Sequence, residues 1–198
     1  MPLIKLYIPS ALLLLVLTCA QVSRSVPVMS KGQPTDSCVI HAQTLLKNVT
    51  HALTQKTLFS AIDCPEQSVE LHMETNTPFV CAPKDSTCSG IATSTFDQDA
   101  CLTNIGGDLY HYYTFLVAQP DPDSLLTPTV LSLRELMENC FAWSKPTDLE
   151  AAADRLSTYD ERLRLCKVLK GFQLRSITIN RAIAYMASGE HAKESTEL

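Results

Sequence analysis

Apolar residues recur at helical spacing in four segments of the chain, and no segment shows a convincing strand pattern. In the first segment, residues 36–58, the recurring positions are Ala42, Leu45, Val49 and Ala52. Steps of three and four residues place them on one face of a helix. The preceding Thr35-Asp36-Ser37 can cap a helix start. This segment predicts a first amphipathic helix over roughly 36–58.

The second and third segments show the same spacing. Residues 96–119 carry Leu102, Ile105, Leu109, Tyr112 and Leu116. Two glycines in this segment each weaken a helix by about 1 kcal/mol relative to alanine, so tertiary packing must stabilise it. In residues 127–143 a proline lies near the helix start, where it is tolerated. The apolar face there is formed by Leu126, Val130, Leu133, Met137 and Cys140.

The fourth segment, about residues 157–187, has no internal proline and predicts the longest helix. Its apolar positions are Leu165, Leu169, Phe172, Ile179, Ile183 and Met186. At 1.5 Å per residue the helix spans roughly 45 Å, which favours a helix bundle. The polar residues 188–198 that follow predict a flexible tail. We therefore expect one helical domain over 36–187.

The connection between the first two helices is long. Periodicity is lost from about residue 60 to residue 95, in a stretch with three prolines and three cysteines. Four helices with long crossovers match the all-α, up-up-down-down bundle, here with a disulfide-tied crossover loop. The short link between the second and third helices would by itself suggest an up-down arrangement. The pattern alone leaves the topology open.

The N-terminus predicts secretion. One lysine, an apolar run at 11–17 and small residues at Thr18 and Ala20 are typical of a signal peptide over 1–20. Cleavage up to about residue 25 also fits. We expect an extracellular protein, in which the sequon Asn48-Val49-Thr50 is a candidate N-glycosylation site.

Secretion also changes how the cysteines are interpreted. Cys19 lies within the predicted leader, which leaves seven of the eight cysteines in the mature chain. In an oxidising compartment cysteines form disulfides, and an odd number leaves one over. The extra cysteine can form a bridge to another chain, remain a free reactive thiol, or be a buried inert thiol.

Composition and motifs exclude several classes of function. The net charge is -5 with a pI of about 5.5, and the basic residues are scattered. We therefore expect no nucleic acid partner and no membrane insertion. No catalytic, metal-binding or cofactor motif is present, so we expect no cofactor and no enzyme. A lipid carrier would need a compact cysteine framework, whereas these cysteines are dispersed.

Residues 159–186 carry a distinctive set of side chains: Tyr159, Cys166 seven residues later, and a run with Phe172, Arg175, Ile177, Thr178, Ile179, Arg181 and Tyr185. With this set the segment resembles the interleukin-12 alpha-subunit family of long-chain helical cytokines. "CVIHAQTLL", "CLTNIGGDLYHYY" and "LRELM" add weaker support. The resemblance implies a secreted cytokine subunit that pairs with a receptor-like beta subunit. It also implies binding to cell-surface receptors that promote T-cell and natural-killer-cell responses. The alternative is another long-chain helical cytokine that acts as a monomer.

The resemblance also implies interface residues. In that family an arginine of the last helix enters an acidic, aromatic-lined pocket of the beta subunit, and the matching residue is Arg181. It lies about 200° around the helix from Ile179, away from the core. Thr178, Arg175 and Tyr185 are expected beside it. Tyr159 matches a receptor-contacting aromatic, although it can equally cap the end of the core.

Three disulfides follow from the resemblance and the expected topology. The family pattern supports Cys64–Cys166 and Cys81–Cys101. In an up-up-down-down bundle the start of the first helix and the end of the third lie at the same pole, which favours Cys38–Cys140. Cys88 then forms the interchain disulfide. The alternative is Cys38–Cys88, with Cys140 left over.

Overall fold

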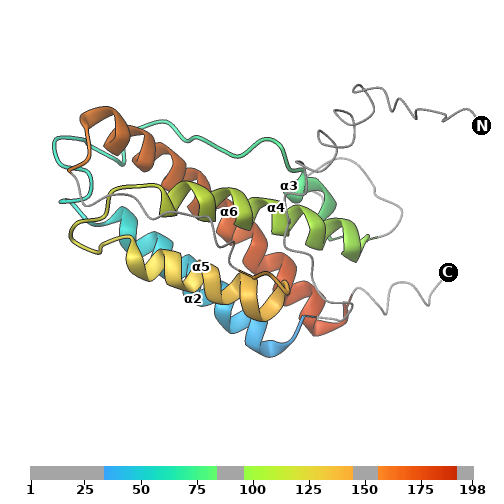
Figure 1. Cartoon of the computed structure of the whole chain (residues 1–198). Helices are drawn as coiled ribbons and strands as arrows, with labels where there is room; N and C mark the ends of the chain where they lie inside the picture. The colour runs from blue at the N-terminus through green and yellow to red at the C-terminus, as the bar shows by residue number, and fades with distance from the viewer. Residues whose placement is uncertain (1–33, 84–95, 145–155, 191–198) are drawn as a thin grey trace, which may run out of the picture.

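Over the residues that the structure describes, the chain folds into a bundle of four long helices and one short one (Figure 1). The computed structural model describes residues 34–83, 96–144 and 156–190. Within these ranges there is no strand, and the helices are α2 (Asp36–Leu53), α3 (Thr77–Val80), α4 (Gln98–Val117), α5 (Thr127–Cys140) and α6 (Tyr159–Ser188). The predicted signal peptide, Cys88 and most of the predicted tail lie outside the described residues.

Helix α2 runs antiparallel to both of its neighbours, α5 and α6. The disulfide Cys38–Cys140 joins the start of α2 to the end of α5. Against α6, the side-chain amide of Asn180 donates to the carbonyl of Ala42 at 2.7 Å. Near the other end of α2, Gln173 donates to the hydroxyl of Thr50 at 3.1 Å.

Helix α4 packs against the same two helices and is antiparallel to α6. Phe96, just before α4, packs edge-to-face on Tyr185 near the end of α6, with ring centroids 5.2 Å apart. At the opposite end, the Arg164 guanidinium lies 5.3 Å from the centre of the Phe115 ring. Helices α2 and α4 therefore run one way and α5 and α6 the other. The predicted up-up-down-down topology is confirmed.

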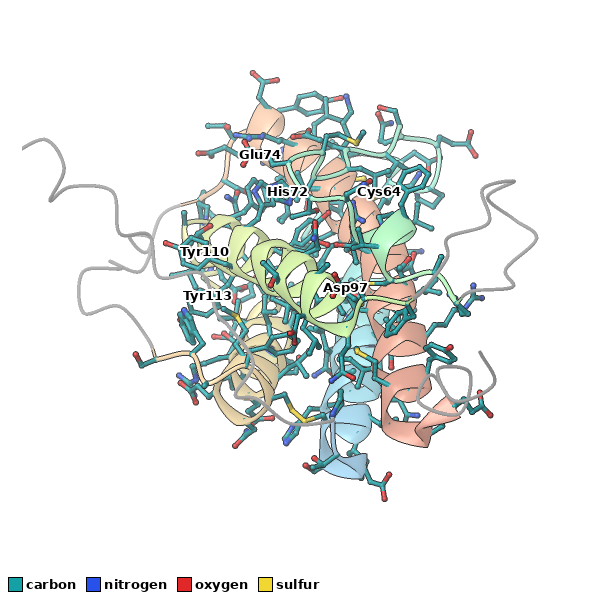
Figure 2. The ribbon with its side chains drawn as sticks, turned by 90° about the vertical axis from the view of Figure 1, so that its right-hand side faces the viewer. Cys64, His72, Glu74, Asp97, Tyr110 and Tyr113 are labelled. Atoms are coloured by element: carbon teal, nitrogen blue, oxygen red, sulfur yellow. A yellow bond between two sulfur atoms is a disulfide. The ribbon has the colours of Figure 1, made fainter. Side chains whose placement is uncertain are left out.

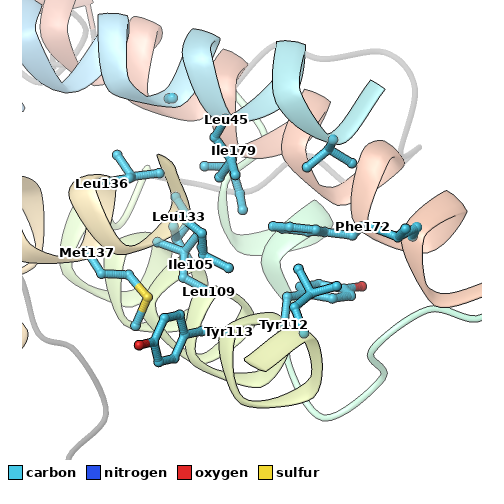
Figure 3. Close-up of a cluster of buried hydrophobic side chains, with 14 of the residues drawn as sticks. Leu45, Ile105, Leu109, Tyr112, Tyr113, Leu133, Leu136, Met137, Phe172 and Ile179 are labelled. Atoms are coloured by element: carbon cyan, nitrogen blue, oxygen red, sulfur yellow. The ribbon is translucent and has the colours of Figure 1, made fainter. Parts of the chain in front are cut away.

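The core lies where the apolar faces of the four long helices meet (Figure 3). Leu45 from α2, Ile105 and Leu109 from α4 and Leu133 from α5 are fully buried there. Tyr112 of α4 stacks on Phe172 of α6 with ring centroids 4.2 Å apart. Every predicted apolar position of the four helices is buried except Val130, which is half-buried. Helical spacing thus identified the core correctly.

Helix α2 ends at Leu53, five residues before the predicted end. The hydroxyl of Thr54 donates to the carbonyl of His51 at 2.7 Å and helps to end the helix. The chain then turns, and Leu58 and Phe59 are buried against the bundle. These apolar residues pack on the core from a turn, so the predicted helix end at residue 58 is wrong.

The crossover between α2 and α4 is tied to the bundle at both ends. Cys64–Cys166 joins its start to α6, and Cys81–Cys101 joins its end to α4. It contains α3, a single turn that the sequence analysis did not predict. The crossover passes so close to α6 that a Cβ at Gly171 would lie 1.9 Å from the carbonyl oxygen of Glu70. Only glycine allows this approach.

Candidate functional site

The outer face of α6 carries most of the predicted interface residues. We define it as Leu174, Thr178, Arg181 and Tyr185. Arg181 is exposed, Leu174 is 48% exposed, and Thr178 and Tyr185 are half-buried. No ion pair is formed by Arg181 with any residue of the described ranges. A cation beside an aromatic ring and an exposed leucine is a typical composition for a protein-binding surface.

Arg175 does not lie on this face, which corrects the prediction from sequence. Its side chain is only 4% exposed, and its Nε lies 3.3 Å from a carboxylate oxygen of Asp108 on α4. Arg175 follows Phe172 by three residues and precedes Ile179 by four, so helical geometry places it on the core side. In this fold its charge is directed inward and is not available to a partner.

Arg175 belongs to a buried polar cluster that holds the crossover to α4 and α6. We call it the crossover clasp: His72, Thr75, Thr77, Asp108 and Arg175. Asp108 is fully buried and accepts hydrogen bonds from the hydroxyls of Thr75, at 2.6 Å, and of Thr77. The guanidinium of Arg175 donates to the carbonyl oxygen of His72 at 2.9 Å. The clasp therefore joins three elements that are far apart in the sequence.

His72 completes the clasp from the crossover. Its Nδ1 donates to Asp108 at 3.1 Å, and its backbone N–H reaches the hydroxyl of Tyr112 at 3.4 Å. Figure 2 shows His72 and Glu74 on the crossover, close to α4. Burial raises the pKa of the Tyr112 hydroxyl, although its contact with the His72 backbone opposes this effect. Buried polar groups are costly unless they are paired, and here they pair across elements.

The sequence analysis missed this clasp, although part of the signal was present. Asp108 stands between Ile105 and Leu109 on the predicted apolar face of the second helix. Arg175 stands on the apolar face of the fourth. Opposite charges at core positions of two helices indicate a buried ion pair. The threonine and histidine partners had no such signal, because they lie in the stretch without periodicity.

Tyr159 is the first residue of α6 and is 52% exposed. The preceding Thr158 accepts from the N–H of Glu161, and the Glu161 carboxylate accepts from the N–H of Thr158, which forms a capping box. Arg162 in the same turn donates to the carbonyl of Ser60 at 3.2 Å. Tyr159 therefore stands outside the core, on a helix end that is firmly held.

The described residues contain three disulfides, Cys38–Cys140, Cys64–Cys166 and Cys81–Cys101. They are the pairs that the sequence analysis favoured. Because Cys38 is bonded to Cys140, the alternative pairing of Cys38 with Cys88 is not formed. Cys88 itself lies outside the described residues.

Asn48 is half-buried at the junction of α2 and α5, and its side-chain amide donates to the carbonyl of Pro128 at 3.1 Å. The hydroxyl of Thr50, the third residue of the sequon, donates to the carbonyl of Leu46 at 2.8 Å. The side-chain nitrogen of Asn48 carries two hydrogens, and the bond to Pro128 uses one of them, so the second hydrogen remains available.

One of the other hollows in the described residues is an open groove of about 630 Å³, lined by residues between 53 and 65. No group of three or more metal-ligating side chains is found in the described parts of the chain. None of the helices in those parts is both long and apolar enough to cross a membrane.

Sequence comparisons relate the chain to one group of curated proteins. It is 25% identical over 196 residues to interleukin-12 subunit alpha of Sus scrofa, covering 83% of this chain and 88% of the relative. It is also 25% identical to the Homo sapiens protein of the same name, covering 90% and 98%. The Papio anubis protein is 23% identical over 90% of this chain. No family model matches. These relatives carry the name of a cytokine subunit, and the helical, disulfide-bonded bundle fits that class.

Proposed function

We propose that this chain, a helical cytokine subunit similar to interleukin-12 alpha over most of its length, is secreted and pairs with a receptor-like beta chain through the outer face of α6. The pair then binds cell-surface receptors and promotes T-cell and natural-killer-cell responses. The observation that carries this proposal is Arg181. It matches the family's interface arginine and is exposed, while the nearby Arg175 is buried.

The chemistry of Arg181 suits an interface anchor. A guanidinium is planar, can pair bidentately with a carboxylate, and stacks on aromatic rings. Arginine is enriched among residues whose truncation costs 2 kcal/mol or more of binding free energy. Tyr185, packed on Phe96, supplies a rigid aromatic neighbour one turn away. An acidic, aromatic-lined pocket is the complementary surface.

The test is association with the beta chain of interleukin-12, measured with purified Arg181→Ala and Arg181→Lys. Arg181→Ala is expected to weaken the noncovalent dissociation constant at least about thirtyfold, equivalent to about 2 kcal/mol. Arg181→Lys is expected to lose part of the affinity, because lysine keeps the positive charge but cannot pair bidentately with a carboxylate. Lys47→Ala, an exposed cation on α2, is the matched control. An unchanged dissociation constant for Arg181→Ala would exclude this interface.

Cys88 is proposed to form the interchain disulfide. With Cys19 in the predicted leader and six cysteines paired, Cys88 is the one left over. Wild type and Cys88→Ser are co-expressed with the beta chain and compared on gels with and without reductant. A reducible heterodimer band that disappears only in Cys88→Ser is expected. A chain secreted alone, with no complex in any condition, would instead favour a cytokine that acts as a monomer.

Tyr159 is proposed as a receptor contact. It is exposed at the start of α6, at the opposite end of the helix from Arg181. Tyr159→Ala should lower receptor binding and signalling by the assembled heterodimer while leaving heterodimer formation unchanged. Equal loss of both would point to a structural role at the end of the core.

Asn48 is proposed to carry an N-glycan. The sequon lies at the half-buried α2–α5 junction, where one amide hydrogen can bond Pro128 while the other position carries the sugar. The secreted protein should lose mass on treatment with a peptide N-glycosidase, and Asn48→Gln should abolish this loss. An identical mass before and after treatment of the wild type would exclude the glycan.

A further inference from the structure

Two histidines stack at the surface edge of the crossover clasp. The rings of His72 on the crossover and His111 on α4 are nearly parallel, with an interplanar angle of 13° and centroids 3.8 Å apart. His72 is buried, and His111 is half-buried beside a small hollow. This stack is part of the contact that holds the crossover against α4.

The charges around this pair come from all three packed elements. The crossover supplies Glu74, whose carboxylate lies 3.6 Å from Nε2 of His72 and is largely exposed. Helix α4 supplies Asp108, at 3.1 Å from Nδ1 of His72. Helix α6 supplies Arg175, paired with Asp108, and Arg164, whose positive charge also acts on His111.

Among the residues that the structure describes, Asp108 is the single buried carboxylate, and it is already shared by two side chains. Asp108 faces Arg175 and His72 at once. Glu74 is close to His72 but faces solvent, where its charge is screened. A proton on His111 would therefore place a positive charge against the His72 ring. No further buried carboxylate in the described residues lies there to offset that charge.

We propose that His72 and His111 form an acid-sensitive latch, in which protonation of His111 at mildly acidic pH releases crossover residues 70–77 from α4. The latch is a property of this chain alone. It holds whether or not the proposed pairing with a beta chain is correct.

The direction of the effect follows from the burial of His111. Burial first, and then the neighbouring His72, lower the pKa of His111 below its ordinary value of 6.5, against the opposing pull of Asp108 and Glu74. Neutral His111 thus stabilises the closed crossover at pH values above about 6.5, and this contribution is lost as the pH falls further. For one proton, the opening equilibrium between pH 7.4 and 5.5 can rise at most about tenfold.

The test is amide hydrogen exchange of the secreted protein, with its partner chain if it is secreted only as a complex. Exchange is measured at pH 7.4 and at pH 5.5. The labelling times are scaled so that an unprotected amide would exchange to the same extent at both pH values. Peptides covering residues 68–78 should open several-fold more at pH 5.5. Peptides of α2 should be protected equally at both values. Equal protection of residues 68–78 at the two pH values would overturn the proposal.

Variants separate the latch from general acid sensitivity. His111→Gln keeps a polar side chain but cannot be protonated, and it should abolish the extra opening at pH 5.5. His51→Gln, at an exposed histidine of α2, should leave it unchanged. Glu74→Gln removes the charge of an exposed carboxylate that lies 3.6 Å from His72, and it should increase opening at pH 5.5. An unchanged pH response in both His111→Gln and Glu74→Gln would overturn the proposal.

Discussion

Two regions of α6 differ sharply although each presents an arginine. Arg175 lies on the side of the helix that faces the crossover and α4, where it is 4% exposed and paired with Asp108. Arg181 lies six residues later, about 240° around the helix axis, and is exposed. The two side chains are identical, so their places on the helix decide their surroundings. The first arginine is paired inside the fold, and the second is exposed on the surface.

The largest effect is expected from removing one partner of the buried pair. Arg175→Ala should lower the free energy of unfolding by about 3–5 kcal/mol, because it removes the guanidinium that faces the buried Asp108 carboxylate. Arg181→Ala should change it by less than about 0.5 kcal/mol. Urea denaturation of the two variants measures both values. Similar unfolding midpoints for the two would abolish the distinction between the regions.

The close approach of the crossover to α6 can be broken at Gly171. Gly171→Ala places a Cβ 1.9 Å from the backbone oxygen of Glu70, and a backbone atom cannot rotate away as a side chain can. A loss of about 3 kcal/mol is expected, at the upper end of the cost of overpacking. Gly107→Ala is the control, because its Cβ would meet only a threonine methyl, at 3.0 Å. Thermal unfolding should show the larger loss for Gly171→Ala.

The outer region of α6 is tested by association. Arg181→Ala should cost about 2 kcal/mol of binding to the beta chain while leaving the unfolding transition unchanged. Leu174→Ala should cost less, because leucine is under-represented among hot-spot residues. Surface plasmon resonance with the beta chain immobilised gives both values. A greater loss for Leu174→Ala than for Arg181→Ala would move the centre of the proposed interface away from the arginine.

The smallest effect concerns the helix that carries both regions. Thr158→Ala removes the side chain that caps α6 and should lower the free energy of unfolding by about 1 kcal/mol. It touches neither the clasp nor the outer face, so beta-chain binding should be retained. Chemical denaturation of Thr158→Ala and of Arg175→Ala measures which of the two variants loses more stability. A cap variant less stable than Arg175→Ala would mean that the clasp contributes little.

Helical periodicity was a good guide wherever residues within one helix decide the outcome. The positions of Leu45, Leu109, Leu133 and Ile179 in the core followed from steps of three and four residues. It was a poor guide to the end of α2, which was predicted at residue 58 although Leu58 packs from the following turn. A buried apolar side chain looks the same in the sequence whether it lies in a helix or in a turn.

The candidate site was predicted in part. Arg181 follows from the family resemblance and from its angle relative to Ile179, and the structure places it on the surface. The prediction for Arg175 was wrong. Arginine is polar and was expected on the surface, whereas its spacing from Phe172 and Ile179 puts it on the core side. The contacts of His72 were not predictable, since it lies 36 residues from Asp108 and 103 residues from Arg175.

The amino-acid sequence was enough to predict the four amphipathic helices, the apolar residues of the core and the resemblance that points to a cytokine subunit. Each depends on neighbours within a few residues along the chain. Helix packing settled that Arg175 meets Asp108 on α4, and that the crossover is held by this shared carboxylate. Those outcomes depend on how α4, α6 and the crossover meet, and the balance between desolvation and pairing is set only when the three elements pack together.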